Sequence, residues 1–254
     1  MTSNQPPEDE FYIGYAPIPR RVKKLLWQFI PSLLLGLIIF ALIIPLVHNQ
    51  FTPTRVGGLV EYEGVLLSQP VPHLVVPRGG DTSLGNAYSR YPLSARNKKS
   101  VSPAILEQTG KWVKLEGSPV HRDHQTLIST KSATPIEPQP QSRVIIPEGR
   151  TLGQFSLTGV IADSKCYLGS MKPGLGKTHR ECAIRCISGG VPPMFVSKNE
   201  SGDRLYFFLV DAQGGQVNDR LLDLVADPVQ ITGEVVSYDD LLILKADPKT
   251  YELL

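Results

Sequence analysis

The sequence predicts a mainly β protein, in which one N-terminal transmembrane helix is followed by two OB-like units, each a small Greek-key barrel. Three observations predict this fold class. A long apolar segment without ionisable residues lies near the N-terminus, and two strand patterns with a central glycine occur twice in the remaining chain. All three cysteines lie in one short stretch of the second copy, which predicts a Cys/His loop insertion there.

Residues 1–24 are predicted to be a cytoplasmic tail, and residues 25–47 a transmembrane helix. No ionisable residue occurs from Leu25 to Val47. At about 1.5 Å per residue this segment is roughly 35 Å long, enough to cross a hydrocarbon core of about 30 Å. The apolar run is longer than that of a signal peptide, roughly 7–15 residues, and no small-residue cleavage pattern follows it. We therefore expect a single, uncleaved membrane span.

The basic residues around the span predict its orientation. Arg20, Arg21, Lys23 and Lys24 directly precede it, whereas only Arg55 lies in the first dozen residues after it. The positive-inside rule then places the N-terminus in the cytoplasm and exports the other 207 residues (254 minus 47). In a bacterium this means an inner-membrane protein with periplasmic C-terminal domains. We expect another membrane or periplasmic protein as partner.

The two strand patterns recur with the same spacing. Residues 59–67 match residues 154–162, and each segment is strand-like with a glycine in its middle, which marks a bulge or bend. Residues 112–123 match residues 229–239 at the same offset of Gly and Asp, and both continue into an apolar strand through a tight turn. Bent strands that end in a hairpin are typical of the OB-fold, where closure of the barrel removes the sheet edges.

The two units differ in how completely the barrel can be predicted. The first unit, residues 52–134, shows no strand pattern between Arg78 and Ser102, so we expect an incomplete OB-like barrel leaning on the second unit. Residues 135–150 form a proline-spaced, semi-rigid linker. The second unit, residues 151–254, carries all five strands. These are Gln154–Asp163, Pro193–Ser197, Arg204–Asp211, Val229–Ser237 and Leu241–Lys245, with a short helix at Asn218–Leu224.

The glycine repeat also locates an insertion. Gly64 and Gly117 are 53 positions apart, whereas Gly159 and Gly233 are 74 apart, so the second unit carries 21 more residues. The extra residues largely coincide with the segment from Cys166 to Cys186, which would join the first two strands. In OB-folds this loop commonly borders the ligand face.

Four residues in this segment have the chemistry of a metal site. His179, Cys182 and Cys186 are spaced i, i+3, i+7, so on a helix of about two turns they share one face. Cys166 can approach from the preceding strand. Thiolate and imidazole ligands suit zinc or copper, and four of them complete a coordination shell.

A disulfide is the alternative use of these cysteines, because an exported domain lies in an oxidising compartment. Cys166 could pair with Cys182 or Cys186, which would close a loop of about 16–20 residues and stabilise it by roughly 3 kcal/mol. Cys182 and Cys186 are poorly placed to pair with each other on a regular helix. One thiol would then remain for redox chemistry.

Several other functions lack their sequence signatures. The chain contains no Cys-x-x-Cys-His motif for covalent haem. Residues 174–178 end like a nucleotide-binding P-loop, but Met171 stands where that motif requires glycine. A net charge of +2 gives no indication of nucleic-acid binding, and export disfavours it. We assign no catalytic residue, since no Ser-His-Asp or paired-carboxylate arrangement stands out.

The spacing Asp-Ser-x-Cys followed by His-x-x-Cys-x-x-x-Cys-x-x-Gly resembles that of exported bacterial OB-like-domain proteins of unknown function. The resemblance covers about residues 152–254 and implies an extracytoplasmic domain. It marks five matching positions in this chain, and two of them, Asp163 and Gly189, are predicted together with the neighbouring Gly190 to support the site rather than to bind the metal. The five are Asp163, Cys166, Cys182, Cys186 and Gly189.

These observations lead to one function and two alternatives. The first is a non-enzymatic, membrane-anchored periplasmic accessory or assembly subunit of a membrane redox system, with a metal in its second barrel. The second is a thiol-redox or metal-transfer protein that uses a free cysteine. The third is a pure interaction module with a structural disulfide.

Overall fold

The structure is a computed structural model of the chain, and it describes residues 18–50, 54–78, 87–138 and 146–254, without the side chains of residues 48–50 and Ser170. The chain divides into two compact units, Met1–Phe51 and Thr52–Leu254. Each unit is described by itself below.

The first unit contains one helix, α1, at Arg20–Gln50. Its segment Arg20–Val47 is long and apolar enough to cross a membrane, and its apolar side chains are exposed within the unit. A helix in a water-soluble core would bury such side chains, so this exposure fits a lipid environment. The helix begins at Arg20, five residues before the predicted span. Of the predicted tail, residues 1–17 lie outside the described residues.

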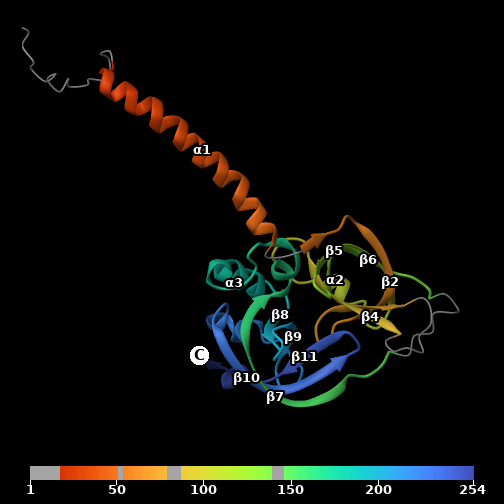
Figure 1. Cartoon of the computed structure of the whole chain (residues 1–254). Helices are drawn as coiled ribbons and strands as arrows, with labels where there is room; N and C mark the ends of the chain where they lie inside the picture. The colour runs from red at the N-terminus through yellow and green to blue at the C-terminus, as the bar shows by residue number, and fades with distance from the viewer. Residues whose placement is uncertain (1–17, 51–53, 79–86, 139–145) are drawn as a thin grey trace, which may run out of the picture. The chain divides into compact units, whose positions relative to one another are not determined.

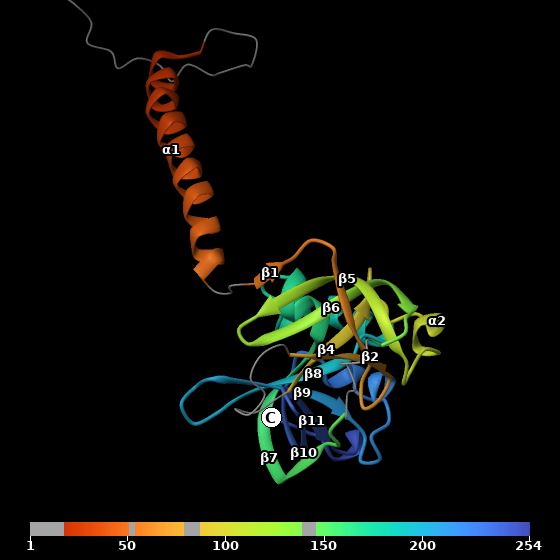
Figure 2. The same cartoon turned by 90° about the vertical axis from the view of Figure 1, so that its right-hand side faces the viewer.

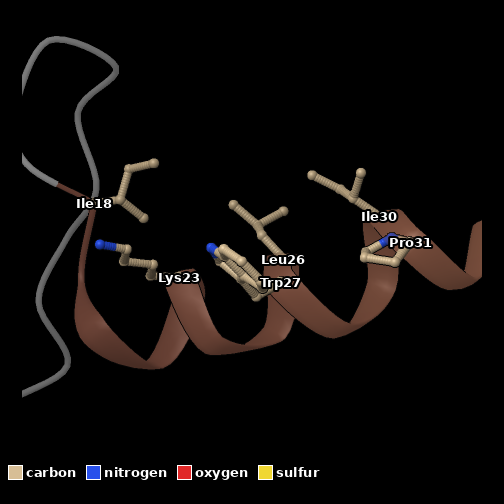
Figure 3. A pocket seen from close by; sticks show the side chains of 6 residues that line it. All are labelled: Ile18, Lys23, Leu26, Trp27, Ile30 and Pro31. Carbon is tan, nitrogen blue, oxygen red and sulfur yellow. The ribbon is translucent and has the colours of Figure 1, made fainter.

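A shallow hollow lies near the first turns of α1 (Figure 3). Its lining is apolar except for Lys23, whose ammonium points toward the N-terminal end of the helix. A lysine near the end of a membrane span takes this direction to keep its charge at the interface. Trp27 lines the same hollow, and tryptophan is enriched at membrane–water interfaces. The other lining residues are Ile18, Leu26, Ile30 and Pro31.

The second unit begins with a closed five-stranded barrel, whose strands Figures 1 and 2 draw in orange to light green. In hydrogen-bonding order its strands run β5-β2-β3-β4-β6, and β6 pairs back onto β5; a short strand, β1, extends β5. β4 and β6 are parallel, while the other pairs are antiparallel. The elements are β1 (Thr54–Val56), β2 (Val60–Leu67), β3 (His73–Pro77), β4 (Tyr88–Ala95), α2 (Pro103–Leu106), β5 (Trp112–Arg122) and β6 (Gln125–Pro135).

The expectation of an incomplete first barrel was wrong. Strand β4 lies within the stretch from Arg78 to Ser102 for which the sequence shows no strand pattern, and it closes the barrel. The pattern is hidden because Ser89 and Arg90, polar residues, are buried in this strand. Alternation of apolar and polar residues predicts a strand only when one face meets water.

The second barrel repeats the connectivity of the first. Its order is β8-β9-β11-β10-β7 in a closed ring, and β9 and β11 are parallel, as β4 and β6 are. Both barrels therefore have the OB-like topology predicted from the sequence. The elements are β7 (Arg150–Asp163), β8 (Pro193–Lys198), β9 (Arg204–Val210), η4 (Asn218–Arg220), η5 (Leu222–Leu224), β10 (Pro228–Tyr238), β11 (Leu241–Lys245), η6 (Pro248–Thr250) and β12 (Glu252–Leu253).

The repeated glycines lie where a strand bends close to its neighbour. A Cβ atom added there would lie 2.2 Å from a carbonyl oxygen of the adjacent strand at Gly64, 3.0 Å at Gly117, and 2.4 Å at both Gly159 and Gly233. Only glycine tolerates the first, third and fourth of these approaches without a shift of backbone. The repeat in the sequence is thus a repeat of strand curvature.

The two barrels contact each other through an apolar layer and through their final hairpins. Asp239, in the turn between β10 and β11, accepts a hydrogen bond from the guanidinium of Arg90 in β4 at 2.7 Å. Asp123, in the equivalent turn between β5 and β6, accepts one from the hydroxyl of Tyr206 in β9. Each barrel therefore places its hairpin turn on the third strand of the other, the reciprocal pattern of a two-fold interface.

Candidate metal centre

The predicted insertion lies between the first two strands of the second barrel. Residues 164–192 join β7 to β8, whereas only residues 68–72 join β2 to β3. The insertion folds into a π-helical turn, η2 (Cys166–Ser170), a 3₁₀ turn, η3 (Lys177–His179), and helix α3 (Arg180–Ser188). Helix α3 packs one face against the hydrophobic core of the second barrel, through its buried residues Ala183 and Ile187.

The insertion also packs on the first barrel. A Cβ atom at Gly169 would lie 2.3 Å from the side chain of Val120 in β5, so glycine is required for this approach. The guanidinium of Arg122 lies over the ring of Tyr167, with its Cζ atom 4.0 Å from the ring centroid. The π-helical turn that carries Cys166 is therefore held between the barrels.

Local structure brings the four predicted ligands together. Strand β7 ends at Asp163, whose Oδ1 accepts a hydrogen bond from the backbone N–H of Cys166 at 2.8 Å and starts the π-helical turn. His179 ends η3, and Cys182 and Cys186 follow on α3 at the predicted helical spacing.

The ligand atoms are close enough for one ion. One atom each from Cys166, His179 and Cys182 lie within 4.8 Å of one another, and the sulfurs of Cys166 and Cys186 are 3.7 Å apart. In a tetrahedral site with zinc–sulfur bonds of about 2.3 Å, two sulfurs lie about 3.8 Å apart. The four predicted residues thus form a group that could hold a metal.

Asp163 orients the imidazole of His179. Its Oδ2 lies 3.0 Å from Nε2 of His179, and both side chains are buried. This pairing assigns the ring proton to Nε2 and leaves Nδ1 as the nitrogen available to an ion. A carboxylate behind a histidine ligand is the usual second layer of zinc sites. The hydrogen bond to Asp163, together with the neighbouring Cys166, raises the pKa of His179 to about 9.

The thiols differ in their exposure. Cys166 is 7 % exposed and Cys186 is fully buried, and both pack against Val191. The hydrogen bond with the thiol of Cys186 is the largest cause that raises the pKa of Cys166, and burial is the second. Cys182 is half-buried. Metal binding here requires release of the thiol protons and of the proton on Nδ1 of His179, since thiolates and neutral imidazole are the ligand forms.

Two lysines missed by the sequence analysis connect the centre to the first barrel. Nζ of Lys98 lies 3.1 Å from the sulfur of Cys182. Lys165, in the insertion of the second barrel, donates hydrogen bonds to two carbonyl oxygens of the first barrel. These are the carbonyls of Ala95 and of Asn97, the latter at 2.8 Å. No sequence signal links Lys98 to a cysteine 84 positions away in another barrel.

The two supporting glycines, Gly189 and Gly190, pack against residues 98–100 of the first barrel. A Cβ atom at Gly189 would lie 2.0 Å from the carbonyl oxygen of Lys98, and one at Gly190 would lie 2.8 Å from the side chain of Ser100. The backbone N–H of Ser100 donates to the carbonyl of Gly189 at 2.9 Å. Gly189 and Gly190 therefore serve the docking of residues 98–100.

The disulfide alternative stays a prediction. All three cysteines are free in the structure. The sulfurs of Cys166 and Cys186 would have to approach from 3.7 Å to about 2.05 Å to form a bond.

No model of a known protein family, no curated protein and no solved structure matches the chain. The function is therefore inferred from the geometry of the centre itself.

Proposed function

We propose that this chain is a membrane-anchored protein that binds zinc or copper through Cys166, His179, Cys182 and Cys186. One observation carries the proposal. Cys166 lies within ligand distance of His179 and Cys182 on one side and of Cys186 on the other, and Asp163 binds Nε2 of the imidazole, which leaves Nδ1 for the ion. A structural disulfide needs neither a third thiol nor an oriented histidine.

The charges around the centre support the same conclusion. Three thiolates, the Asp163 carboxylate and a neutral imidazole carry a charge of −4, so a divalent ion leaves about −2 and a monovalent ion about −3. The ammonium of Lys98 lies 3.1 Å from the sulfur of Cys182, and the ammonium of Lys165 interacts electrostatically with Cys166 and Cys186. Two nearby cations offset this residual charge, as a partly buried anionic site requires.

The position in the cell belongs to the same proposal. Helix α1 anchors the chain in the bacterial inner membrane, and the basic residues before it keep the N-terminus in the cytoplasm. The barrels then lie in the periplasm, close to the membrane. We place the protein there as a non-enzymatic accessory or assembly subunit of a membrane redox system, because soft thiolate and imidazole ligands suit the copper of such systems.

The test is elemental analysis of the full chain, purified in detergent without chelators, together with thiol counting after denaturation. We expect about one zinc or copper per chain and three recovered thiols. A chain without metal that yields one free thiol would show a disulfide and contradict the metal centre.

A thiol-redox role is the second candidate, and a specific observation favours it. Cys182 is half-buried and contacts Lys98, while Cys166 and Cys186 lie 3.7 Å apart behind it. A reactive thiol beside a cation with a neighbouring buried thiol pair is suited to disulfide exchange. The same measurement separates the two roles, because a redox protein would carry three thiols when reduced and no metal.

A further inference from the structure

The centre is open to solvent on one side only. Cys166, His179 and Cys186 are 7 %, 3 % and 0 % exposed, and among the four ligands only Cys182 reaches the surface. An ion that enters or leaves must therefore contact Cys182 first or last. A ligand in this position is the one that can be shared with another molecule during transfer.

The first barrel controls this open side. Lys98 places its ammonium 3.1 Å from the sulfur of Cys182, although its own side chain is exposed to solvent. Its position is fixed at the backbone, because Lys165 binds the carbonyl of Asn97 at 2.8 Å and Gly189 packs against the carbonyl of Lys98.

Exposed basic residues flank the contact between Lys98 and Cys182 along the chain. Arg96, Lys98 and Lys99 are all exposed in the segment that docks on the centre. Arg185 is exposed three residues after Cys182 and so lies one helical turn from it. We call Arg96, Lys98, Lys99 and Arg185 the cationic rim.

Charges farther along the insertion are partly compensated within the second barrel. Arg180 and Lys177 both pair with Asp227, the former at 2.6 Å, so one carboxylate offsets one of their two positive charges. Glu181 is the acidic neighbour of Cys182 in the sequence. One acid against four exposed bases leaves a positive potential at the open ligand.

Resting on the proposed function, we propose that Cys182 is the exchange ligand of the centre and that the cationic rim selects an acidic protein as the metal donor or acceptor. Transfer is then a ligand exchange without change of oxidation state. The sulfur of Cys182 binds the ion and displaces one donor ligand, which takes the thiol proton. Cys166 and Cys186 lose their thiol protons and His179 loses the proton on Nδ1 as they displace the remaining donor ligands. These protons go to the displaced donor ligands or to solvent, so the exchange involves no oxidant or reductant.

The first experiment measures how charge steers reagents to Cys182. The full chain, reduced and metal-free in detergent, reacts with a dianionic aromatic disulfide and, separately, with an uncharged one. The fastest thiol should disappear in Cys182→Ser and persist in Cys166→Ser and Cys186→Ser. In Lys98→Met, the ratio of the anionic rate to the neutral rate should fall about three- to tenfold at about 0.01 M salt, and the difference should vanish near about 0.5 M.

The ratio is the decisive quantity, because a change in the intrinsic reactivity of the thiol alters both rates equally. Lys114→Met is the matched control: it removes the same charge from the first barrel, but Lys114 pairs with Glu61 and should leave the ratio unchanged. An unchanged ratio in Lys98→Met, or a fast thiol other than Cys182, would overturn the proposal.

The second experiment follows release of zinc from the loaded full chain to an anionic and to an uncharged chelator. Lys98→Met should slow release to the anionic chelator by a similar factor and leave the uncharged one unaffected. If the chain does not bind zinc or copper at all, the proposed function fails, while the thiol rates still test the rim. If it binds metal and Lys98→Met has no selective effect, only the exchange proposal fails.

Discussion

At the scale of single residues, Asp163 has the largest influence on the centre. One carboxylate oxygen accepts from the backbone of Cys166 and the other from the imidazole of His179. A fully buried side chain thus fixes two ligands from different elements. The sequence analysis placed Asp163 among the supporting residues, which understates its part in the site.

We predict that Asp163→Asn weakens metal binding by about 10- to 100-fold. Asparagine keeps an oxygen for the N–H of Cys166 but loses the carboxylate that makes the imidazole basic and fixes its tautomer. Competition with a chromophoric chelator measures the affinity. Asp219→Asn makes the same chemical change at an exposed position and should bind metal normally. A folded Asp163→Asn protein with unchanged affinity would remove Asp163 from the centre.

A second buried residue makes the stability depend on pH. The Nδ1 of His73 donates to the carbonyl of Val71 at 2.7 Å, and Nη1 of Arg90 donates to its Nε2 at 3.1 Å. The imidazole is therefore neutral in the fold. Burial is the largest cause that lowers the pKa of His73, to about 4, against about 6.5 in the unfolded chain.

Between these two values the unfolded chain binds the extra proton, so stability is lost as the pH falls from about 6.5 to about 4. His73 should account for about 2 kcal/mol of lost stability between about pH 7 and about pH 5. Urea unfolding at several pH values measures this loss. In His73→Gln the pH slope should be shallower by that amount, since the titrating group is gone. Parallel slopes in the two proteins would show that His73 does not titrate as described.

At the scale of elements, the segment after β4 docks into a niche that glycine makes possible. Gly189 and Gly190 end helix α3, and residues 98–100 of the first barrel lie against them. The end of α3 is thus shaped by contact with another barrel, as well as by the usual preference of helix ends for glycine.

We predict that Gly189→Ala destabilises the protein by about 1–3 kcal/mol, because its Cβ atom would overlap the carbonyl of Lys98. The melting temperature should fall by roughly 3–10 °C. Gly58→Ala is the control, since no atom lies within 4 Å of the added methyl group and the change should be nearly neutral. An equal effect of the two substitutions would mean that the docking contact contributes little.

At the scale of the whole second unit, Arg90 joins the two barrels. Its guanidinium binds Asp239 at 2.7 Å and the carbonyl of Pro147 at 2.8 Å, and its backbone N–H binds the carboxylate of Asp240 at 2.9 Å. The Arg90 side chain is 1 % exposed. An arrangement of the barrels that separated Arg90 from these acceptors would leave a buried guanidinium unpaired, so the contacts favour the observed arrangement.

We predict that Arg90→Met costs about 3–5 kcal/mol, since it leaves the Asp239 carboxylate largely buried without its cation. Because the contact lies between barrels, calorimetry should show two unfolding transitions in place of one. Arg150→Met, at an exposed position, should keep a single transition. A single, merely shifted transition in Arg90→Met would show that the apolar layer alone couples the barrels.

The sequence by itself determined the features that depend on neighbours along the chain. The apolar helix follows from an uninterrupted run of apolar residues, and the strands of the second barrel from local alternation and turn residues. The repeated Gly and Asp positions indicated two related barrels, and the four predicted ligands lie within 21 residues, from Cys166 to Cys186, so spacing alone could group them.

Only the tertiary structure decided the features that depend on segments far apart in the sequence. Strand β4 escaped prediction because polar residues are buried in it, among them Arg90, which binds Asp239 of the other barrel, and no local pattern records such a contact. The contact of Lys98 with Cys182 and the niche at Gly189 arise from the packing of two separately patterned barrels. Local periodicity reports which face of an element avoids water, and it carries no information about which distant segment covers that face.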